Sequence, residues 1–126
     1  MKLTDNFNKS EFDSKDGACM PNDVLQNISN LAKEVQKIRN KVGTIVINSG
    51  YRSPEHNKKV GGVANSYHVQ GKAADLNPKN VSVKKLYDTI IDMIKKGELR
   101  DGGVGIYNTF VHYDIGNKGR RWDYRK

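Results

Sequence analysis

Apolar side chains between Asn22 and Gly43 recur every three or four residues, and this spacing constrains the fold more than any other feature of the chain. The stripe consists of Val24, Leu25, Ile28, Leu31, Val35, Ile38 and Val42. Residues with this spacing lie on one face of an α-helix, so the stripe predicts a long amphipathic helix that ends at Gly43. Such a helix must bury its apolar face, which requires other elements of the same chain to pack against it.

The remaining segments alternate between short strands and helices. The sequence predicts strands at 44–50 and 72–77, a helical turn after Pro54, a helix between Ser82 and Gly97, and a hairpin of 104–107 and 110–115 that turns at Asn108 and Thr109. Residues 1–21 are expected to be irregular, with Phe7 and Phe12 anchored on the core. For a chain of 126 residues we therefore expect one α+β domain, 1–126, with a small central antiparallel sheet flanked by helices.

The overall composition excludes several classes of protein. No apolar run approaches the roughly 18 residues that a membrane-spanning helix needs. The N-terminus "MKLTDNFNKSEF" lacks the apolar segment of a secretory signal, so we expect synthesis in the cytoplasm without a signal peptide. The one cysteine, Cys19, excludes an intramolecular disulfide and a thiolate-rich metal cluster, and is expected to be an idle thiol.

The chain is basic, with 22 lysines and arginines against 14 acidic residues and a formal net charge of +8. This balance is compatible with nucleic acid, with an anionic membrane surface or with an anionic polymer such as a bacterial wall. The lysines are scattered along the two predicted helices, however, and no nucleic-acid-binding motif is recognisable. We therefore expect a monomer that does not bind nucleic acid.

An aspartate interrupts the predicted strand "KAADLN" at position 75, and its charge needs a partner if the strand is buried. His68 precedes Asp75 by seven residues. In "FVHYDI" the alternation of a strand places His112 and Asp114 on one face and leaves the apolar neighbours on the other. Two imidazoles and a carboxylate with an open fourth position are typical of catalytic zinc sites, so His68, Asp75 and His112 are candidate zinc ligands.

Interpretations without a metal are also open. Asp75 could form a salt bridge with Arg52, and Asp114 could pair with Arg120 or Arg121. A histidine on a strand is also more often hydrogen-bonded than bound to a metal.

The segment "SGYRSPEHNKKVGGVANSYHVQGKAADL", followed by "GVGIYNTFVHYDIG", resembles the zinc D-Ala-D-Ala carboxypeptidase family of peptidoglycan peptidases, related to the Hedgehog-type (LAS) metallopeptidases. The family pattern S-x-H-x-x-G-x-A-x-D is met by Ser66, His68, Gly71, Ala73 and Asp75. "SGYRSP" and "FVHYD" match two flanking segments, and "NKSEFDSKDG" resembles the start of compact phage and bacterial members. The resemblance covers nearly the whole chain and implies the Hedgehog/DD-peptidase (LAS) type of α+β fold.

The resemblance also implies roles for single residues. It makes the zinc ligands His68, Asp75 and His112. It assigns Arg52 to the scissile carbonyl oxygen or to a substrate carboxylate, and a guanidinium suits either because it can bridge two oxygens. Ser66 is expected to contact the substrate or to orient a ligand, and Gly71 to let the loop turn past the metal.

The chain departs from the family at the general base. Many relatives carry an acid three residues before the last zinc histidine, where this chain has Thr109. Compact members carry an acid two residues after that histidine, and here this residue is Asp114. Asp114 is therefore the predicted general base.

Taken together, these features predict a zinc peptidase that hydrolyses stem or cross-bridge peptides of bacterial peptidoglycan. We expect a D,D-carboxypeptidase or endopeptidase, in the form of a phage-type endolysin that a separate lysis system releases to the wall. The alternatives are a cytosolic D-Ala-D-Ala dipeptidase and a non-catalytic, zinc-stabilised wall-binding or virion-structural module. In the tail, Trp122 and Tyr124 are expected to close the core, with a wall of the cleft as the second interpretation.

Overall fold

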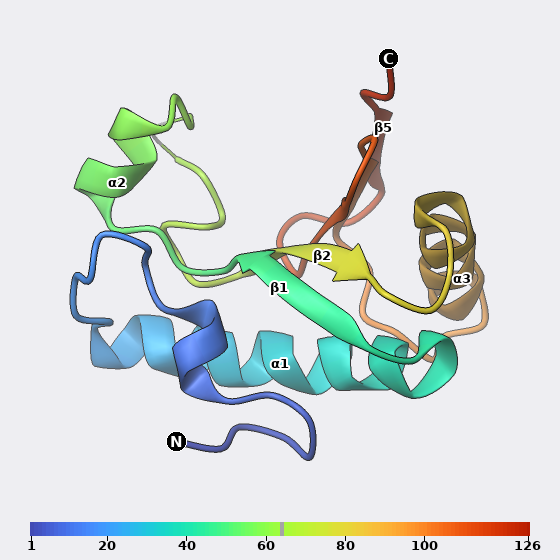
Figure 1. The fold of residues 1–126 in the computed structure, drawn as a ribbon, viewed down its shortest axis with the longest axis horizontal. Helices are drawn as coiled ribbons and strands as arrows, with labels where there is room; N and C mark the ends of the chain where they lie inside the picture. The colour runs from blue at the N-terminus through green and yellow to red at the C-terminus, as the bar shows by residue number, and fades with distance from the viewer. Residues whose placement is uncertain (64) are drawn as a thin grey trace.

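A computed structural model describes residues 1–63 and 65–126, and shows a five-stranded sheet with its two longest helices packed on one side (Figure 1). Its elements in chain order are the 3-10 helix η1 (Lys9–Phe12), α1 (Asn22–Val42), β1 (Ile45–Ser49), α2 (Pro54–Lys59), β2 (Ala73–Pro78), α3 (Val83–Lys95), β3 (Gly103–Ile106), β4 (Val111–Asp114) and β5 (Arg120–Asp123). The α+β class and the elements predicted before residue 116 are confirmed.

The helix boundaries lie where the sequence places them. The α1 helix ends at Gly43, whose φ of 84° an L-residue rarely adopts, and α3 begins after Ser82, whose side chain accepts a hydrogen bond from the Lys85 backbone. Ser53 caps α2 in the same way, with Pro54 at the first helical position.

The strands follow the order β1-β2-β4-β3-β5, and the first four are antiparallel to their neighbours. Alternate residues of the central strands point to opposite faces. One face packs on α1 and α3, and it consists of Ala74, Leu76, Val104, Ile106, Val111 and Tyr113. The opposite face carries Asp75, His112 and Asp114, so the polar residues lie on the side of the sheet away from the core.

The strand β5 was not predicted and corrects one detail of the expected sheet. Residues 120–123 pair with β3 in the parallel direction, so the sheet is mixed rather than entirely antiparallel. Arg120 and Trp122 lie on the polar face, and Arg121 points the other way, toward α3. Trp122 is only half-buried and Tyr124 is 63% exposed, so neither closes the core as expected.

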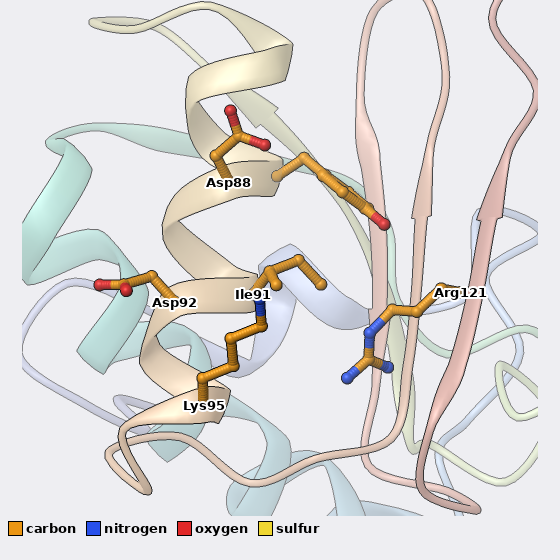
Figure 2. A pocket seen from close by; sticks show the side chains of 6 residues that line it. Asp88, Ile91, Asp92, Lys95 and Arg121 are labelled. Atoms are coloured by element: carbon orange, nitrogen blue, oxygen red, sulfur yellow. The ribbon is translucent and has the colours of Figure 1, made fainter.

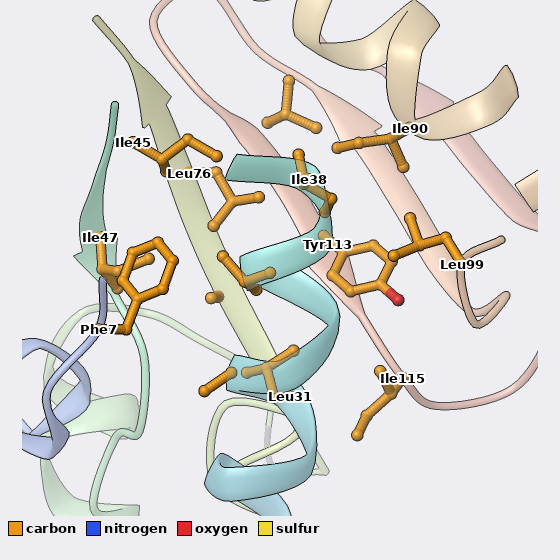
Figure 3. Packing of buried hydrophobic residues seen from close by; sticks show 14 of the residues in the cluster. Phe7, Leu31, Ile38, Ile45, Ile47, Leu76, Ile90, Leu99, Tyr113 and Ile115 are labelled. Carbon is orange, nitrogen blue, oxygen red and sulfur yellow. The ribbon is translucent and has the colours of Figure 1, made fainter. Parts of the chain in front are cut away.

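The core lies between α1, α3 and the apolar face of the sheet (Figure 3). Ile28, Leu31, Val35 and Ile38 of the α1 stripe are fully buried, together with Leu86 and Ile90 of α3. The Tyr113 hydroxyl donates to the Arg100 carbonyl oxygen at 2.6 Å, which satisfies the polar end of a ring buried in this core.

The N-terminal segment supports the end of β1. Phe7 and Phe12 are buried, as predicted, and their rings meet edge to face. The Phe12 carbonyl oxygen accepts a hydrogen bond from the Tyr51 backbone at 2.8 Å. A side chain at Gly50 would collide with the Phe12 backbone, so the two segments can approach this closely only with glycine there.

A groove of about 480 Å³ lies between α3 and β5, on the other side of β5 from the polar face (Figure 2). Most charges beside it are paired, in the salt bridges Lys84–Asp88, Lys96–Asp92 and Arg121–Asp101. Its lining holds no imidazole or thiol. Among the described residues, no helix is both long and apolar enough to cross a membrane.

Gly71 gives a test of how the loop before β2 is held. Its φ is +75°, and a methyl group there would lie 2.7 Å from the Val24 side chain and 2.8 Å from the Val24 carbonyl oxygen. We expect Gly71→Ala to lower the free energy of unfolding by about 3 kcal/mol, from backbone strain plus collision with α1. Urea denaturation measures this loss.

Gly119→Ala is the matched control, because Gly119 has a φ of +79° and a methyl group added there would have nothing within 4 Å. It should cost only the strain, about 1 kcal/mol. Equal losses in the two variants would show that the contact with α1 contributes nothing.

Candidate metal centre

Two of the predicted ligands face each other across neighbouring strands. Asp75 of β2 is paired in register with His112 of β4, and the antiparallel ladder places both on the polar face. Two residues before Asp75, Ala73 is paired with Asp114, so Asp114 lies beside His112 on that face. The β1 strand has an irregular register between Ile47 and Ser49, next to Asp75. The sheet thus brings three of the predicted site residues together.

His68 reaches the same place from the loop between α2 and β2. Its Nδ1 donates to the Gly50 carbonyl oxygen at 2.8 Å, since a carbonyl can only accept. Its backbone is held on both sides, by Ser66 Oγ, which accepts from the His68 N–H at 3.1 Å, and by the Arg52 N–H, which donates to the His68 carbonyl oxygen at 3.1 Å. The ring therefore presents Nε2 toward the strands.

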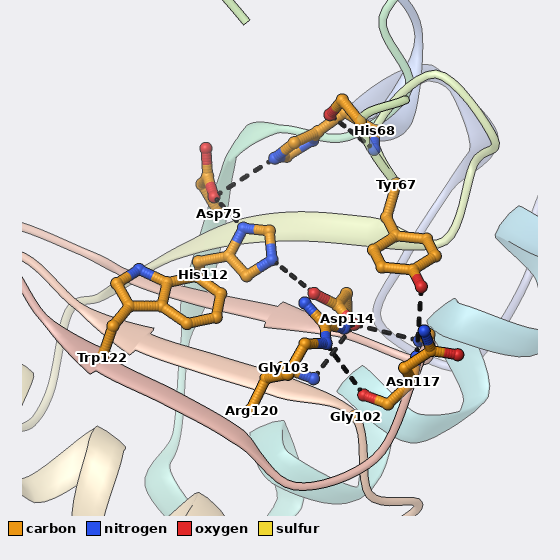
Figure 4. A network of polar contacts seen from close by, with 12 residues as sticks. Tyr67, His68, Asp75, Gly102, Gly103, His112, Asp114, Asn117, Arg120 and Trp122 are labelled. Carbon is orange, nitrogen blue, oxygen red and sulfur yellow. Dashed lines mark hydrogen bonds and ion pairs between the residues drawn. The ribbon is translucent and has the colours of Figure 1, made fainter. Parts of the chain in front are cut away.

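The three candidate ligands point their free electron pairs at one region (Figure 4). Asp75 Oδ1 lies 3.5 Å from His68 Nε2 and 3.2 Å from His112 Nδ1. Zinc held tetrahedrally at about 2.0–2.1 Å separates neighbouring ligand atoms by about 3.3 Å, which these two distances match. Three such atoms also repel one another unless a cation or a proton lies between them. The donor set and the two distances from Asp75 therefore fit a zinc ion, and all three ligand atoms lie within 4.8 Å of one another.

Asp114 lies behind the His112 ring, on the side away from Asp75. Its Oδ2 accepts from His112 Nε2 at 2.7 Å, and its Oδ1 accepts from the backbone N–H groups of Gly103 at 3.0 Å and Gly116 at 2.9 Å. Arg120 adds a salt bridge to the same Oδ1. The carboxylate is fully buried and is surrounded by donors.

The hydrogen bonds of this cluster shift the pKa values of its members. Burial raises the pKa of Asp114, but the hydrogen bond and charge of His112 outweigh it and, together with Gly116 and Arg120, lower this pKa to about 2. Burial likewise raises the pKa of Asp75, and the contacts with His112 and His68 bring it well below its ordinary range. The pKa of His112 is lowered by burial and raised more strongly by Asp114 and Asp75, so the net shift is upward. Both carboxylates are therefore ionised at neutral pH.

Arg52 lies on the other side of Asp75, with its Nη2 3.7 Å from Asp75 Oδ2. Ser49 Oγ and Asn57 Oδ1 each accept a hydrogen bond from its guanidinium at 3.3 Å. The two ion pairs considered from the sequence, Arg52–Asp75 and Arg120–Asp114, are thus both present beside the three candidate ligands. Arg121 pairs with Asp101 instead.

A cleft of about 440 Å³ opens beside His112. Its walls include Asn65, Ser66, Tyr67, Tyr107, Trp122 and Tyr124. Trp122 lies with its ring centroid 5.1 Å from that of His112, so it forms a wall of the cleft, the second of the two sequence interpretations. Tyr67, Tyr107 and Arg120 were missed as site residues, because only the pairing of β5 with β3 and the path of the loop bring them here.

Thr109 and His56 lie outside the cluster of candidate ligands. Thr109 is exposed in the turn between β3 and β4, where many relatives are expected to carry an acid. His56, the third histidine of the chain, lies on α2 beside Asp16 and Glu55 and is not among the three candidate ligands.

A model of the peptidase M15 family matches residues 3–114, which include every candidate ligand. The chain belongs to the peptidase M15 family. Its match thus spans the elements from η1 to β4 and stops before β5.

A curated relative is the probable peptidoglycan L,D-endopeptidase MepK of Haemophilus influenzae. It is 35% identical over 106 residues, which cover 75% of this chain and 54% of the relative. The chain therefore spans about half the length of the curated relative that it matches.

Metal binding tests the three ligands directly. We expect the purified protein to bind one zinc ion, and His68→Ala, Asp75→Ala and His112→Ala each to weaken binding by at least about 100-fold, since each removes one of three protein ligands. Equilibrium dialysis with metal analysis measures this. Binding of zinc should also raise the thermal unfolding temperature, and a chelator should reverse the rise.

His56→Ala is the matched control, because it removes the one histidine outside the cluster and should leave zinc affinity unchanged. Loss of binding in His56→Ala, or retention of full affinity in all three ligand variants, would contradict the assigned centre.

Proposed function

We propose that this M15 peptidase is a zinc-dependent enzyme that hydrolyses peptide bonds of bacterial peptidoglycan. The observation that carries the proposal is the convergence of His68 Nε2, Asp75 Oδ1 and His112 Nδ1 beside an open cleft. Three protein ligands leave one position of a tetrahedral zinc ion for water or substrate, which is the arrangement of catalytic rather than structural zinc. The named function of the curated relative supports peptidoglycan as the substrate.

When bound, zinc would supply Lewis acidity toward the scissile carbonyl and a more acidic water. Arg52 would supply the second positive charge. Its guanidinium is held by Ser49 and Asn57 on the side of Asp75 away from His112, and its partner Asp75 is one of the residues that would hold the zinc ion. Arg52 can therefore offer N–H groups to the carbonyl oxygen as negative charge develops, or bind a substrate carboxylate.

The contacts of Asp114 favour a different role from the predicted general base. Asp114 was predicted as the general base, yet its Oδ2 is occupied by His112 and its Oδ1 by three other donors. A carboxylate that accepts the proton of a ligand histidine fixes the tautomer of the ring. We therefore favour Asp114 as a positioning residue, which keeps the proton on His112 Nε2 and the electron pair on Nδ1 for the metal.

The bond that the enzyme cleaves and the way it reaches the wall are proposed from the family resemblance. It supports a D,D-carboxypeptidase or endopeptidase released to the wall as a phage-type endolysin, whereas the name of the curated relative indicates cleavage between L- and D-configured centres. Mass spectrometry of the fragments released from a defined peptidoglycan identifies the bond, because each specificity leaves a different new terminus.

Asp114→Asn distinguishes the two roles of this residue. Three donors face Oδ1, so the asparagine oxygen would turn toward them and its NH₂ group toward His112 Nε2. His112 would then carry its proton on Nδ1, and we expect zinc affinity to fall about 10- to 100-fold. Dialysis of the folded variant measures the affinity, and peptidoglycan cleavage at saturating zinc measures the remaining activity.

Full zinc affinity combined with loss of turnover would instead identify Asp114 as the general base. Full affinity combined with normal turnover would exclude both roles. Asp101→Asn is the control, since Asp101 pairs with Arg121 and takes no part in the cluster.

Cleavage of purified peptidoglycan tests the function as a whole. The zinc-loaded protein should reduce the turbidity of a wall suspension and release new amino termini, and His68→Ala and Arg52→Ala should each lower this rate at least about 100-fold. Release of free alanine from D-Ala-D-Ala without lysis would favour the dipeptidase. Zinc binding and wall binding with no released product would favour the non-catalytic module.

A further inference from the structure

We propose that the cleft beside His112 is a saccharide-binding site, in which an uncharged sugar ring of the glycan strand stacks on Trp122. The proposal rests on the proposed function, because the sugar is taken to be the part of the substrate adjoining the cleaved peptide. It assigns a role to β5, which lies outside the residues matched by the family model.

Trp122 reaches the metal centre across a row of paired residues. Asp75 is paired with His112, His112 with Gly105, and Gly105 with Trp122, so the row crosses four strands on the polar face. A side chain at Gly105 would overlap the indole. Glycine at this position therefore lets the indole lie over β3 and come next to His112 (Figure 4).

The indole is held in place before any ligand arrives. Its Nε1 donates to the Tyr107 hydroxyl at 3.0 Å, and the Tyr107 ring is stacked on Phe110 with a centroid distance of 4.4 Å. Tyr124 meets Tyr107 edge to face at 5.6 Å and is 63% exposed, so the aromatic surface continues outward from the metal centre. An aromatic wall that is already fixed loses little side-chain entropy on binding.

The charges near the centre favour an uncharged ligand on this side. Arg120, the one arginine among the described residues that line the cleft, is paired with Asp114 and lies 4.8 Å over the Tyr67 ring. Asn65, Ser66 and the tyrosine hydroxyls supply neutral polar groups. Arg52 lies on the other side of Asp75, toward α2 with its lysines 58 and 59. A carboxylate of the stem peptide would therefore be bound on the Arg52 side and a neutral group on the Trp122 side.

A sugar ring matches this lining better than a peptide segment. A pyranose has an apolar C–H face that can stack on an indole, and a rim of hydroxyl and acetamido groups that hydrogen-bond with serine, asparagine and tyrosine. Stem peptides of peptidoglycan are short and carry carboxylates, which this part of the cleft does not neutralise. We therefore infer that the glycan lies on the β5 side and the peptide crosses the centre toward Arg52.

Trp122 is the only tryptophan of the chain, so its fluorescence reports directly on the site. We expect a saturable change in emission when the zinc-loaded protein is titrated with the tetramer of β-1,4-linked N-acetylglucosamine, which has no peptide bond to cleave. One stacked ring with a few hydrogen bonds predicts a dissociation constant of about 1 mM. Unchanged emission up to about 10 mM would overturn the proposal.

Kinetics with two substrates test the same site in the working enzyme. Trp122→Ala should lower kcat/KM for a stem peptide attached to its glycan about tenfold and leave kcat/KM for the free stem peptide unchanged, while Trp122→Phe should restore most of the loss. Equal losses on the two substrates would overturn the saccharide assignment and make Trp122 a support for His112. No loss on either would exclude Trp122 from binding.

Controls separate this proposal from the function on which it rests. Arg121→Ala, on the other face of β5, should leave the fluorescence titration unchanged. Zinc content and circular dichroism verify that each Trp122 variant is folded and loaded. If the enzyme cleaves no peptidoglycan, the fluorescence titration still decides whether the cleft binds a saccharide.

Discussion

The antiparallel pairing of β2 with β4 is the constraint on which the rest of the site depends. It places Asp75 opposite His112 and Ala73 opposite Asp114, so one register provides two candidate ligands and the carboxylate behind them. A shift of the register by one residue would turn Asp75 toward the core, where Leu76 now lies. The apolar residues between these polar ones keep the register, because they bury the other face of the same strands on α1.

The N-terminal segment and β5 hold the polar residues of the site in position from either side. Phe12 and Gly50 bring the N-terminal segment against the end of β1, and the Gly50 carbonyl in turn orients the His68 ring. On the other side, Arg120 of β5 pairs with Asp114, which holds His112. Each candidate ligand histidine thus has its other ring nitrogen bound by an oxygen, the Gly50 carbonyl for His68 and the Asp114 carboxylate for His112, and in metal sites such an outer contact sets the tautomer.

Much of this arrangement could be predicted from the sequence. The period of the α1 stripe, the Ser82 cap and the glycines after both helices predicted the helices, since these signals are local. The alternation in "FVHYDI" correctly separated His112 and Asp114 from the buried Val111 and Tyr113. The acid within "KAADLN" indicated a polar partner for Asp75, and the strand pairing puts that partner directly opposite it.

The parts that could not be predicted depend on contacts between distant segments. The tail "GRRWDY" has no strong strand pattern, and it becomes a strand because β3 offers a free edge and two glycines that accommodate Arg120 and Trp122. The surroundings of Asp114 likewise follow from β3 and β5 rather than from its distance to His112 in sequence. For this reason the family pattern could indicate an acid near the histidine but not the side of the ring on which it lies.

The placement of these groups gives the centre two chemically different sides. Arg52 is fixed by Ser49 and Asn57 near α2, whereas Trp122 is fixed by Tyr107 at the far edge of the sheet. The candidate ligands lie between them, so under the proposed function a substrate that contacts both sides would bind with its negative groups toward Arg52. Two local features of the sequence produce this difference between the sides. Arg52 follows the end of β1, and Gly105 lets the indole of Trp122 lie over β3. Specificity in this proposal comes from the edges of the sheet, while the central strands supply two of the three candidate ligands, Asp75 and His112.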